Sequence, residues 1–149
     1  MLVIFIIIAA ALTLAFISTS KPSSNMPPTQ TPTPTETTNV DIKASFTIIT
    51  GNITRNFSAE KYHNQSTDVY IENPDPSVIY VTKTGITWDD FFKTLPMKLT
   101  KDCLITGDGE TLCAGNGKTL KFFLNDIETP NLLDKEIMDG DKTLIIFKP

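Results

Sequence analysis

The sequence contains few of the side chains on which redox and metal chemistry depend, with two cysteines and one histidine among 149 residues. It has no C-x-x-C motif and no basic residue directly beside either cysteine, which argues against a reactive thiol pair. Two cysteines and one distant histidine also fall short of a zinc-ligand set. We therefore predict no catalytic residues, no metal site and no cofactor.

Positive charge is also scarce, because 13 lysines and arginines stand against 17 aspartates and glutamates, for a net charge of −4. Proteins that bind nucleic acid or an anionic lipid surface need clustered cations, so neither partner is expected. The first 40 residues differ sharply in composition from the rest. The remainder, about 109 residues, is long enough for one domain with a core of its own.

Residues 1–20 form a nearly unbroken apolar run without a charged side chain. This run is short for a transmembrane anchor and long for the apolar region of a signal peptide, so both interpretations stay open. No cysteine follows it, which excludes a lipoprotein anchor. We expect a single-pass protein of the cell membrane with its domain on the extracytoplasmic side, or a secreted protein after signal cleavage.

Residues 21–40 consist mainly of threonine, serine and proline. Such a segment cannot bury enough apolar surface to offset the entropy lost on ordering, so it is predicted to be a disordered linker. Its composition also resembles that of O-glycosylated stalks. Residues 41–149 then form the extracytoplasmic domain.

Three N-x-S/T sequons, at Asn52, Asn56 and Asn64, lie in the segment 51–67, which we interpret as an exposed loop. Three such motifs close together, on a chain with an export segment, indicate glycosylation sites on a surface loop. The alternative is that the sequons are unused, because glycosylation depends on the organism.

Residues 85–96 form the most clearly predicted helix. Thr87 is the expected N-cap, and Asp90 follows three residues later as the partner of a capping box. Pro96 ends the helix, because the residue before a proline is driven out of the α region. Four apolar residues recur at helical spacing and predict a buried stripe against a sheet. They are Trp88, Phe91, Phe92 and Leu95.

Residues 103–113 predict a β-hairpin in which Cys103 lies opposite Cys113. Folding this segment about Asp108 leaves the three-residue loop 107–109, in which glycine can adopt the left-handed conformation. Cysteines that lie directly opposite at a non-hydrogen-bonded pair are at disulfide distance. We therefore predict one structural disulfide between Cys103 and Cys113, as is usual in an exported chain.

Runs of β-branched and aromatic residues predict strands before and after the helix. The predicted fold class is α+β, a mixed sheet packed on one helix. In this prediction the disulfide-closed hairpin is an insertion, and an apolar N-terminal helix precedes the domain. The strands are expected at 44–50, 68–72, 77–84, 119–125 and 142–148.

The element order over residues 68–147 resembles the ubiquitin-like β-grasp superfamily. The resemblance is carried by the helix start GITWDDFF at 85–92, by FFLN at 122–125, and by the turn 139–141 before an apolar strand. Soluble-ligand-binding β-grasp domains of extracellular proteins and a group of membrane-anchored archaeal proteins are similar. The resemblance implies a β-grasp-like sheet. Sulfur carriers of this superfamily end in Gly-Gly, whereas this chain ends in Phe-Lys-Pro, so carrier activity is not expected.

Together these features predict a non-enzymatic, membrane-tethered extracytoplasmic module that binds a protein or a small ligand. The alternative is a structural accessory subunit of a cell-envelope assembly. A broad exposed apolar patch would favour the binding function. The only histidine, His63, lies in the sequon loop and is interpreted as a surface residue. A pocket that holds His63 together with two carboxylates would instead indicate an enzyme.

Overall fold

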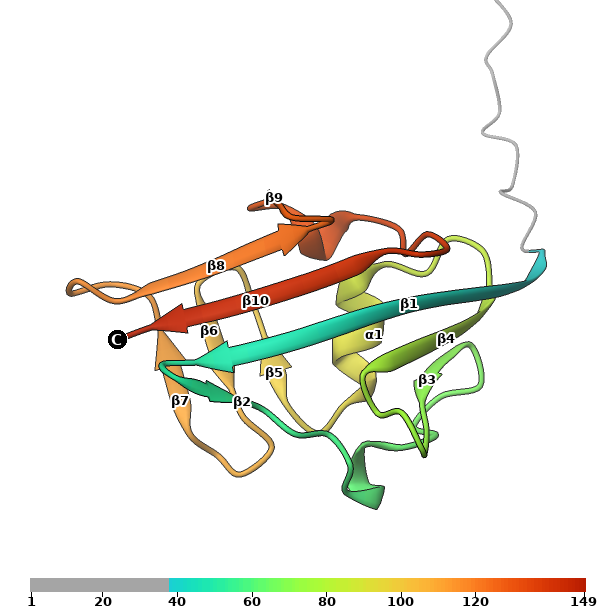
Figure 1. Cartoon of the computed structure of the whole chain (residues 1–149), viewed down its shortest axis with the longest axis horizontal. Helices are drawn as coiled ribbons and strands as arrows, with labels where there is room; N and C mark the ends of the chain where they lie inside the picture. Colours follow the sequence, from blue (N-terminus) through green and yellow to red (C-terminus); the bar gives the residue numbers. More distant parts are fainter. Residues whose placement is uncertain (1–37) are drawn as a thin grey trace, which may run out of the picture. The chain divides into compact units, whose positions relative to one another are not determined.

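The computed structural model describes residues 38–149, which belong to one compact unit (Figure 1). The apolar helix predicted at 1–20 and nearly all of the predicted linker lie outside the described residues. Within residues 38–149, no helix is long and apolar enough to cross a membrane.

The main sheet is built around β1 (Asn39–Thr50), which pairs in parallel with β10 (Lys142–Lys148) on one side. On its other side, β1 pairs antiparallel with β4 along its first half and with β2 at its end. The strand order is β3-β4-β1-β10-β8-β9. The other strands are β2 (Ile53–Thr54), β3 (Val69–Ile71), β4 (Val78–Lys83), β8 (Thr119–Leu124) and β9 (Ile127–Glu128).

A second, three-stranded sheet of order β5-β6-β7 contains the cysteine hairpin. The register of β6 and β7 pairs Cys103 with Cys113, which confirms the predicted hairpin. Gly109 has a φ of +88°, the left-handed conformation expected in its loop. The elements are α1 (Trp88–Thr94), β5 (Lys98–Leu99), β6 (Cys103–Ile105), β7 (Thr111–Cys113) and two 3₁₀ turns, η1 (Glu60–Tyr62) and η2 (Leu132–Asp134).

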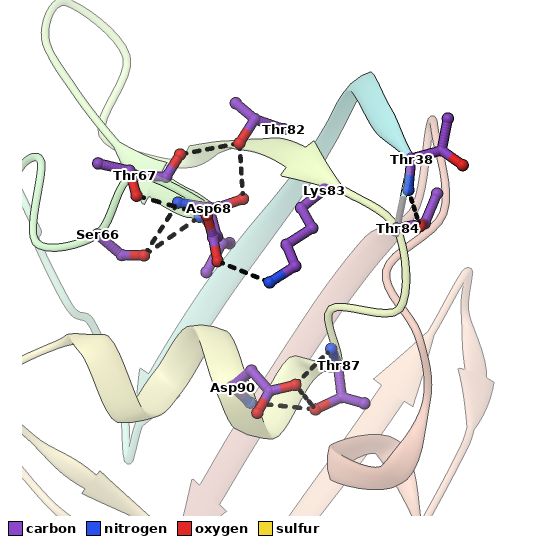
Figure 2. Close-up of polar contacts among 10 residues, drawn as sticks. Thr38, Ser66, Thr67, Asp68, Thr82, Lys83, Thr84, Thr87 and Asp90 are labelled. Carbon is purple, nitrogen blue, oxygen red and sulfur yellow. Dashed lines mark hydrogen bonds and ion pairs between the residues drawn. The ribbon is translucent and has the colours of Figure 1, made fainter. Parts of the chain in front are cut away.

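The helix α1 begins at the predicted capping box, shown in Figure 2. Asp90 N donates to Thr87 Oγ1 at 3.1 Å, and Thr87 N donates to Asp90 Oδ2 at 2.9 Å. All four residues of the predicted apolar stripe are buried. The capping box and the stripe therefore explain both where the helix starts and which face it turns to the sheet.

Alternate residues of β1 face α1, as the two-residue period of a strand requires. Phe46 on this face makes an edge-to-face contact with Phe91, their ring centroids 5.1 Å apart. The core extends from these rings to both sheets and to the 51–67 loop. Its largest fully buried side chains include Ile48, Ile71, Ile79, Trp88, Phe91, Phe92, Leu104, Leu132, Ile137 and Ile145.

The predicted fold class was wrong. Strands are the dominant regular structure of the described residues, and α1 has only seven residues, so a single short helix covers part of the sheet face. The cysteine hairpin is not an insertion, because it joins β5 in a second sheet whose Leu99 and Leu104 belong to the buried core. The N-terminal helix of the prediction lies outside the described residues. The resemblance over 68–147 also left out β1, the strand at the centre of the main sheet.

The first described residues are joined to the end of β4 (Figure 2). Thr38 N donates to Thr84 Oγ1 at 3.0 Å, and Thr84 N donates to Thr38 O at 3.1 Å. Beside them, the Lys83 ammonium pairs with Asp68 at 3.3 Å and ties β4 to the start of β3. The chain therefore enters the sheet at a fixed point at the N-terminal end of β1.

Candidate functional site

A cavity of about 320 Å³ lies at the C-terminal end of β1, between the 51–67 loop and the tip of the cysteine hairpin. Its buried lining residues are Ile48, Phe57, Tyr62 and Leu104, and Met97 is half-buried. The exposed lining residues are Ile53, Thr54, Asn56 and Asp108. The cavity thus has an apolar interior and a largely polar mouth.

The 51–67 loop is folded onto the core by two aromatic side chains. Phe57 packs on Phe46 with ring centroids 4.8 Å apart, and Tyr62 on η1 packs on Phe57 at 5.1 Å. The expectation of a wholly exposed loop was therefore wrong at these positions. Phe57 also lines a second cavity of about 300 Å³, on the side of Ser77, and is one of the residues that the two cavities share.

Two ion pairs join the loop to the hairpin tip. Arg55 pairs with Glu110, and Lys61 Nζ lies 2.9 Å from Asp108 Oδ1. The hydrogen bond from Lys61 lowers the pKa of Asp108 and raises that of Lys61. Both pairs lie near solvent, where such contacts are individually weak. Together they link opposite walls of the cavity.

The hairpin tip also depends on the predicted cysteine pair. Cys103 and Cys113 are joined by a disulfide at the base of the hairpin whose loop forms one wall of the cavity. A covalent closure at the base restricts mainly the unfolded chain and thereby stabilises the folded hairpin. It therefore supports the wall that carries Thr106 and Asp108.

The three sequon asparagines are exposed and lie in different surroundings. Asn56 lines the cavity, and its Oδ1 accepts a hydrogen bond of 2.7 Å from Ser58 N. Asn64 has a left-handed backbone with φ of 52°, and its N–H donates to Ile71 O. Asn52 lies in the turn after β1. The structure does not gather the three into one site.

His63 lines an open hollow of about 410 Å³ together with Glu60 and Glu72, which meets the condition set for a catalytic interpretation. Its Nε2 is 2.9 Å from Phe57 O, so in the neutral ring this nitrogen is the donor. No ion pair joins His63 to a carboxylate within the described residues. No group of His, Cys, Asp and Glu side chains in residues 38–149 could hold a metal ion.

The most informative residue of the cavity, Arg55, was missed in the sequence. It is the only arginine of the chain, and it lies between two sequons. Its Nε donates to Thr50 Oγ1 at 2.7 Å, and its backbone N–H donates to Ile48 O at 2.8 Å. The sequence could have drawn attention to Arg55, because every other cationic residue of the chain is a lysine.

Comparisons with protein-family models, curated proteins and solved structures found no match to this chain.

Proposed function

We propose that this protein is a non-enzymatic binding module whose small ligand occupies the cavity between the sequon loop and the cysteine hairpin. The observation that carries the proposal is the cavity itself, about 320 Å³ with a buried apolar interior and polar groups at its mouth. Small-molecule sites have this character, and this volume lies at the lower end of their range. A small ligand therefore fits better than an extended one.

A small ligand is also favoured over a protein partner by the scarcity of exposed apolar side chains. The large apolar side chains exposed in residues 38–149 are Ile53, Ile127 and Met138. Ile53 belongs to the cavity mouth. Three such side chains do not indicate the broad apolar patch of a protein-docking face.

The proposal includes the tether and the compartment expected from the sequence. The disulfide between Cys103 and Cys113 supports an oxidising, extracytoplasmic environment. The chain enters β1 at Asn39, and the cavity begins at Ile48, about 30 Å farther along the strand at ~3.3 Å per residue. A ligand at the cavity is then bound at the end of the domain away from its tether.

The direct test is binding of small apolar fragments to the full-length chain, with 2-naphthalenemethanol as an uncharged probe, followed by NMR of methyl groups. We expect shifts at Ile48, Met97 and Leu104. Ile53→Asp should weaken binding about fivefold by removing apolar contact at the mouth. Ile127→Asp changes an equally exposed isoleucine on β9 and is the matched control. Equal effects of the two variants, or no shift at the lining residues, would contradict the proposal.

The compartment is tested by mass spectrometry of the native protein. It reports the mature N-terminus, the state of Cys103 and Cys113, and the occupancy of Asn52, Asn56 and Asn64 together. Free thiols and three bare asparagines would argue against export. Co-purification of a stoichiometric partner from native membranes would instead support the alternative, an accessory subunit of an envelope assembly.

The hollow around His63 supports a second, weaker candidate function, acid–base catalysis. His63 lines a hollow with two carboxylates, but within residues 38–149 no side chain holds its ring toward a nucleophile. Hydrolysis of p-nitrophenyl acetate by the full-length chain tests this candidate. Loss of the rate in His63→Gln, with fragment binding unchanged, would favour it.

A further inference from the structure

We infer that the ligand of this cavity is a small apolar carboxylic acid and that Arg55 binds its carboxylate. The inference rests on the proposed function and names the chemical class of the ligand. It is carried by the position and the incomplete hydrogen bonding of a single, partly buried guanidinium at the edge of an apolar cavity.

Arg55 is held in place by two hydrogen bonds, which leave most of its N–H donors unused. Its Nε–H is bound to the hydroxyl of Thr50, which is itself buried, and its Nη2 is bound to Glu110. A guanidinium has five N–H donors, so these two bonds leave three for another acceptor. The side chain is 25% exposed and lines the cavity. The guanidinium of Arg55 is therefore held in one orientation, and only part of its hydrogen-bonding capacity is used.

Glu110 is an exchangeable partner for this guanidinium. Its side chain is 51% exposed and is not part of the cavity lining. A pair with so exposed a carboxylate contributes little, because water and salt screen it. A ligand carboxylate held by its apolar body inside the mouth is less screened and can meet the planar fork of arginine with two parallel bonds.

The charges around the cavity favour an anionic over a cationic ligand. Asp108 is the acidic residue in the lining, and its carboxylate is already bound by Lys61 at 2.9 Å. Lys61 also lies over the ring of Tyr62, 5.0 Å from its centroid. A ligand amine would have to displace this lysine, whereas a ligand carboxylate finds donors of Arg55 available.

The lining and the volume of the cavity limit the shape and the size of the ligand's apolar body. Two aromatic residues, Phe57 and Tyr62, and the thioether-bearing Met97 are among the lining residues. Such groups favour flat aromatic or short aliphatic bodies. A cavity of about 320 Å³ holds one small ring system or short chain rather than a long lipid.

The test compares 2-naphthoate, 2-naphthalenemethanol and 2-naphthylmethylamine, which share one body and differ in charge, on the full-length chain. We expect 2-naphthoate to bind best of the three. Arg55→Gln should weaken 2-naphthoate about tenfold, because it removes a charge-assisted hydrogen bond, and leave the alcohol unchanged. Lys61→Gln is the matched control at the second cation and should change 2-naphthoate less than twofold. Glu110→Gln should strengthen 2-naphthoate, because it removes a competing carboxylate.

Binding of the alcohol to Arg55→Gln also shows that this variant keeps its folded cavity. If the three probes bind equally, or if Arg55→Gln weakens the alcohol as much as 2-naphthoate, the ligand class is wrong while the binding proposal stands. If the amine binds best, Asp108 and not Arg55 selects the ligand. If none of the three shifts the lining residues, the proposed function fails as well.

Discussion

Tyr62 lies so close to Gly107 that a Cβ atom at position 107 would come within 2.5 Å of Tyr62 Oη and 3.0 Å of Pro96 O. This contact joins η1 to the hairpin tip across the wall of the cavity. Glycine at 107 is required here by the close approach of a side chain, whereas Gly109 is required by its left-handed backbone. The two glycines of one short loop thus serve different purposes.

Gly107→Ala is therefore expected to destabilise the protein by about 1–3 kcal/mol, because the new methyl group must displace Tyr62 or the hairpin. Urea unfolding of the full-length chain measures this loss. Adding Tyr62→Phe removes the nearest atom, so the double variant should recover part of the stability. If the two changes are additive, the hydroxyl of Tyr62 does not oppose the alanine.

Replacing both cysteines, as Cys103→Ser with Cys113→Ser, should lower the free energy of unfolding by up to about 3 kcal/mol, since the closed loop is short. The sequence separation of the pair is 10 residues. Urea unfolding with and without reductant checks this expectation. Reductant should destabilise the natural chain and leave the double variant unaffected. Equal sensitivity of the two proteins would mean that the disulfide has no such role.

Local patterns predicted the parts of the fold that local contacts determine. The Thr87–Asp90 capping box and the aromatic stripe lie within one short segment, and both occur as expected. The opposition of Cys103 and Cys113 follows from counting residues on either side of a glycine loop. Strand β10 was predicted with its observed bounds, 142–148, from its β-branched and aromatic residues.

Contacts between distant segments were not predictable from these patterns. β1 pairs in parallel with β10, so Ser45 lies beside Lys142, and no local signal specifies such a pairing. The short strand β5 was missed because two residues, Lys98 and Leu99, carry no periodicity. Phe57 lies among polar residues and sequons, so its burial depends on the distant Phe46 rather than on its neighbours.

The cavity was missed for the same reason. Its lining comes from β1, the sequon loop, the segment after α1 and the hairpin, which only the folded chain brings together. Arg55 belongs to no motif, and its side chain bonds to Thr50, five residues away, and to Glu110, 55 residues away. The sequence shows that Arg55 is the single arginine, but its position at the cavity is seen only in the folded chain.

Asp90 should make the stability depend on pH in the acidic range. Its pKa is lowered from 3.8, chiefly by the hydrogen bond from the Thr87 backbone and then by the Thr87 hydroxyl. Because the pKa in the folded state is the lower one, the stabilisation is complete above the unfolded value. It is lost as the pH falls below about 4 through the folded pKa.

Asp90→Asn should therefore cost about 1 kcal/mol near pH 7, within the range of cap substitutions, and the difference from the natural chain should shrink below about pH 4. Urea unfolding at a series of pH values measures it. Asp89→Asn removes the neighbouring first-turn carboxylate, which pairs with Lys93 but not with Thr87, and is the matched control. A pH-independent difference for Asp90→Asn would show that its charge is not involved.

Phe57 lines both cavities beside the sequon loop, and its truncation should join them. Phe57→Ala is expected to cost about 3 kcal/mol, because an aromatic side chain packed on Phe46 and Tyr62 is removed. Phe57→Leu keeps most of the volume and should cost less. In the alanine variant, 2-anthroate, with one more ring, should gain affinity relative to 2-naphthoate, whereas Phe57→Leu should keep the natural preference. If Phe57→Ala keeps the natural preference for 2-naphthoate over 2-anthroate, the ring of Phe57 does not set the size limit of the ligand. The loop would then have collapsed onto the vacated space.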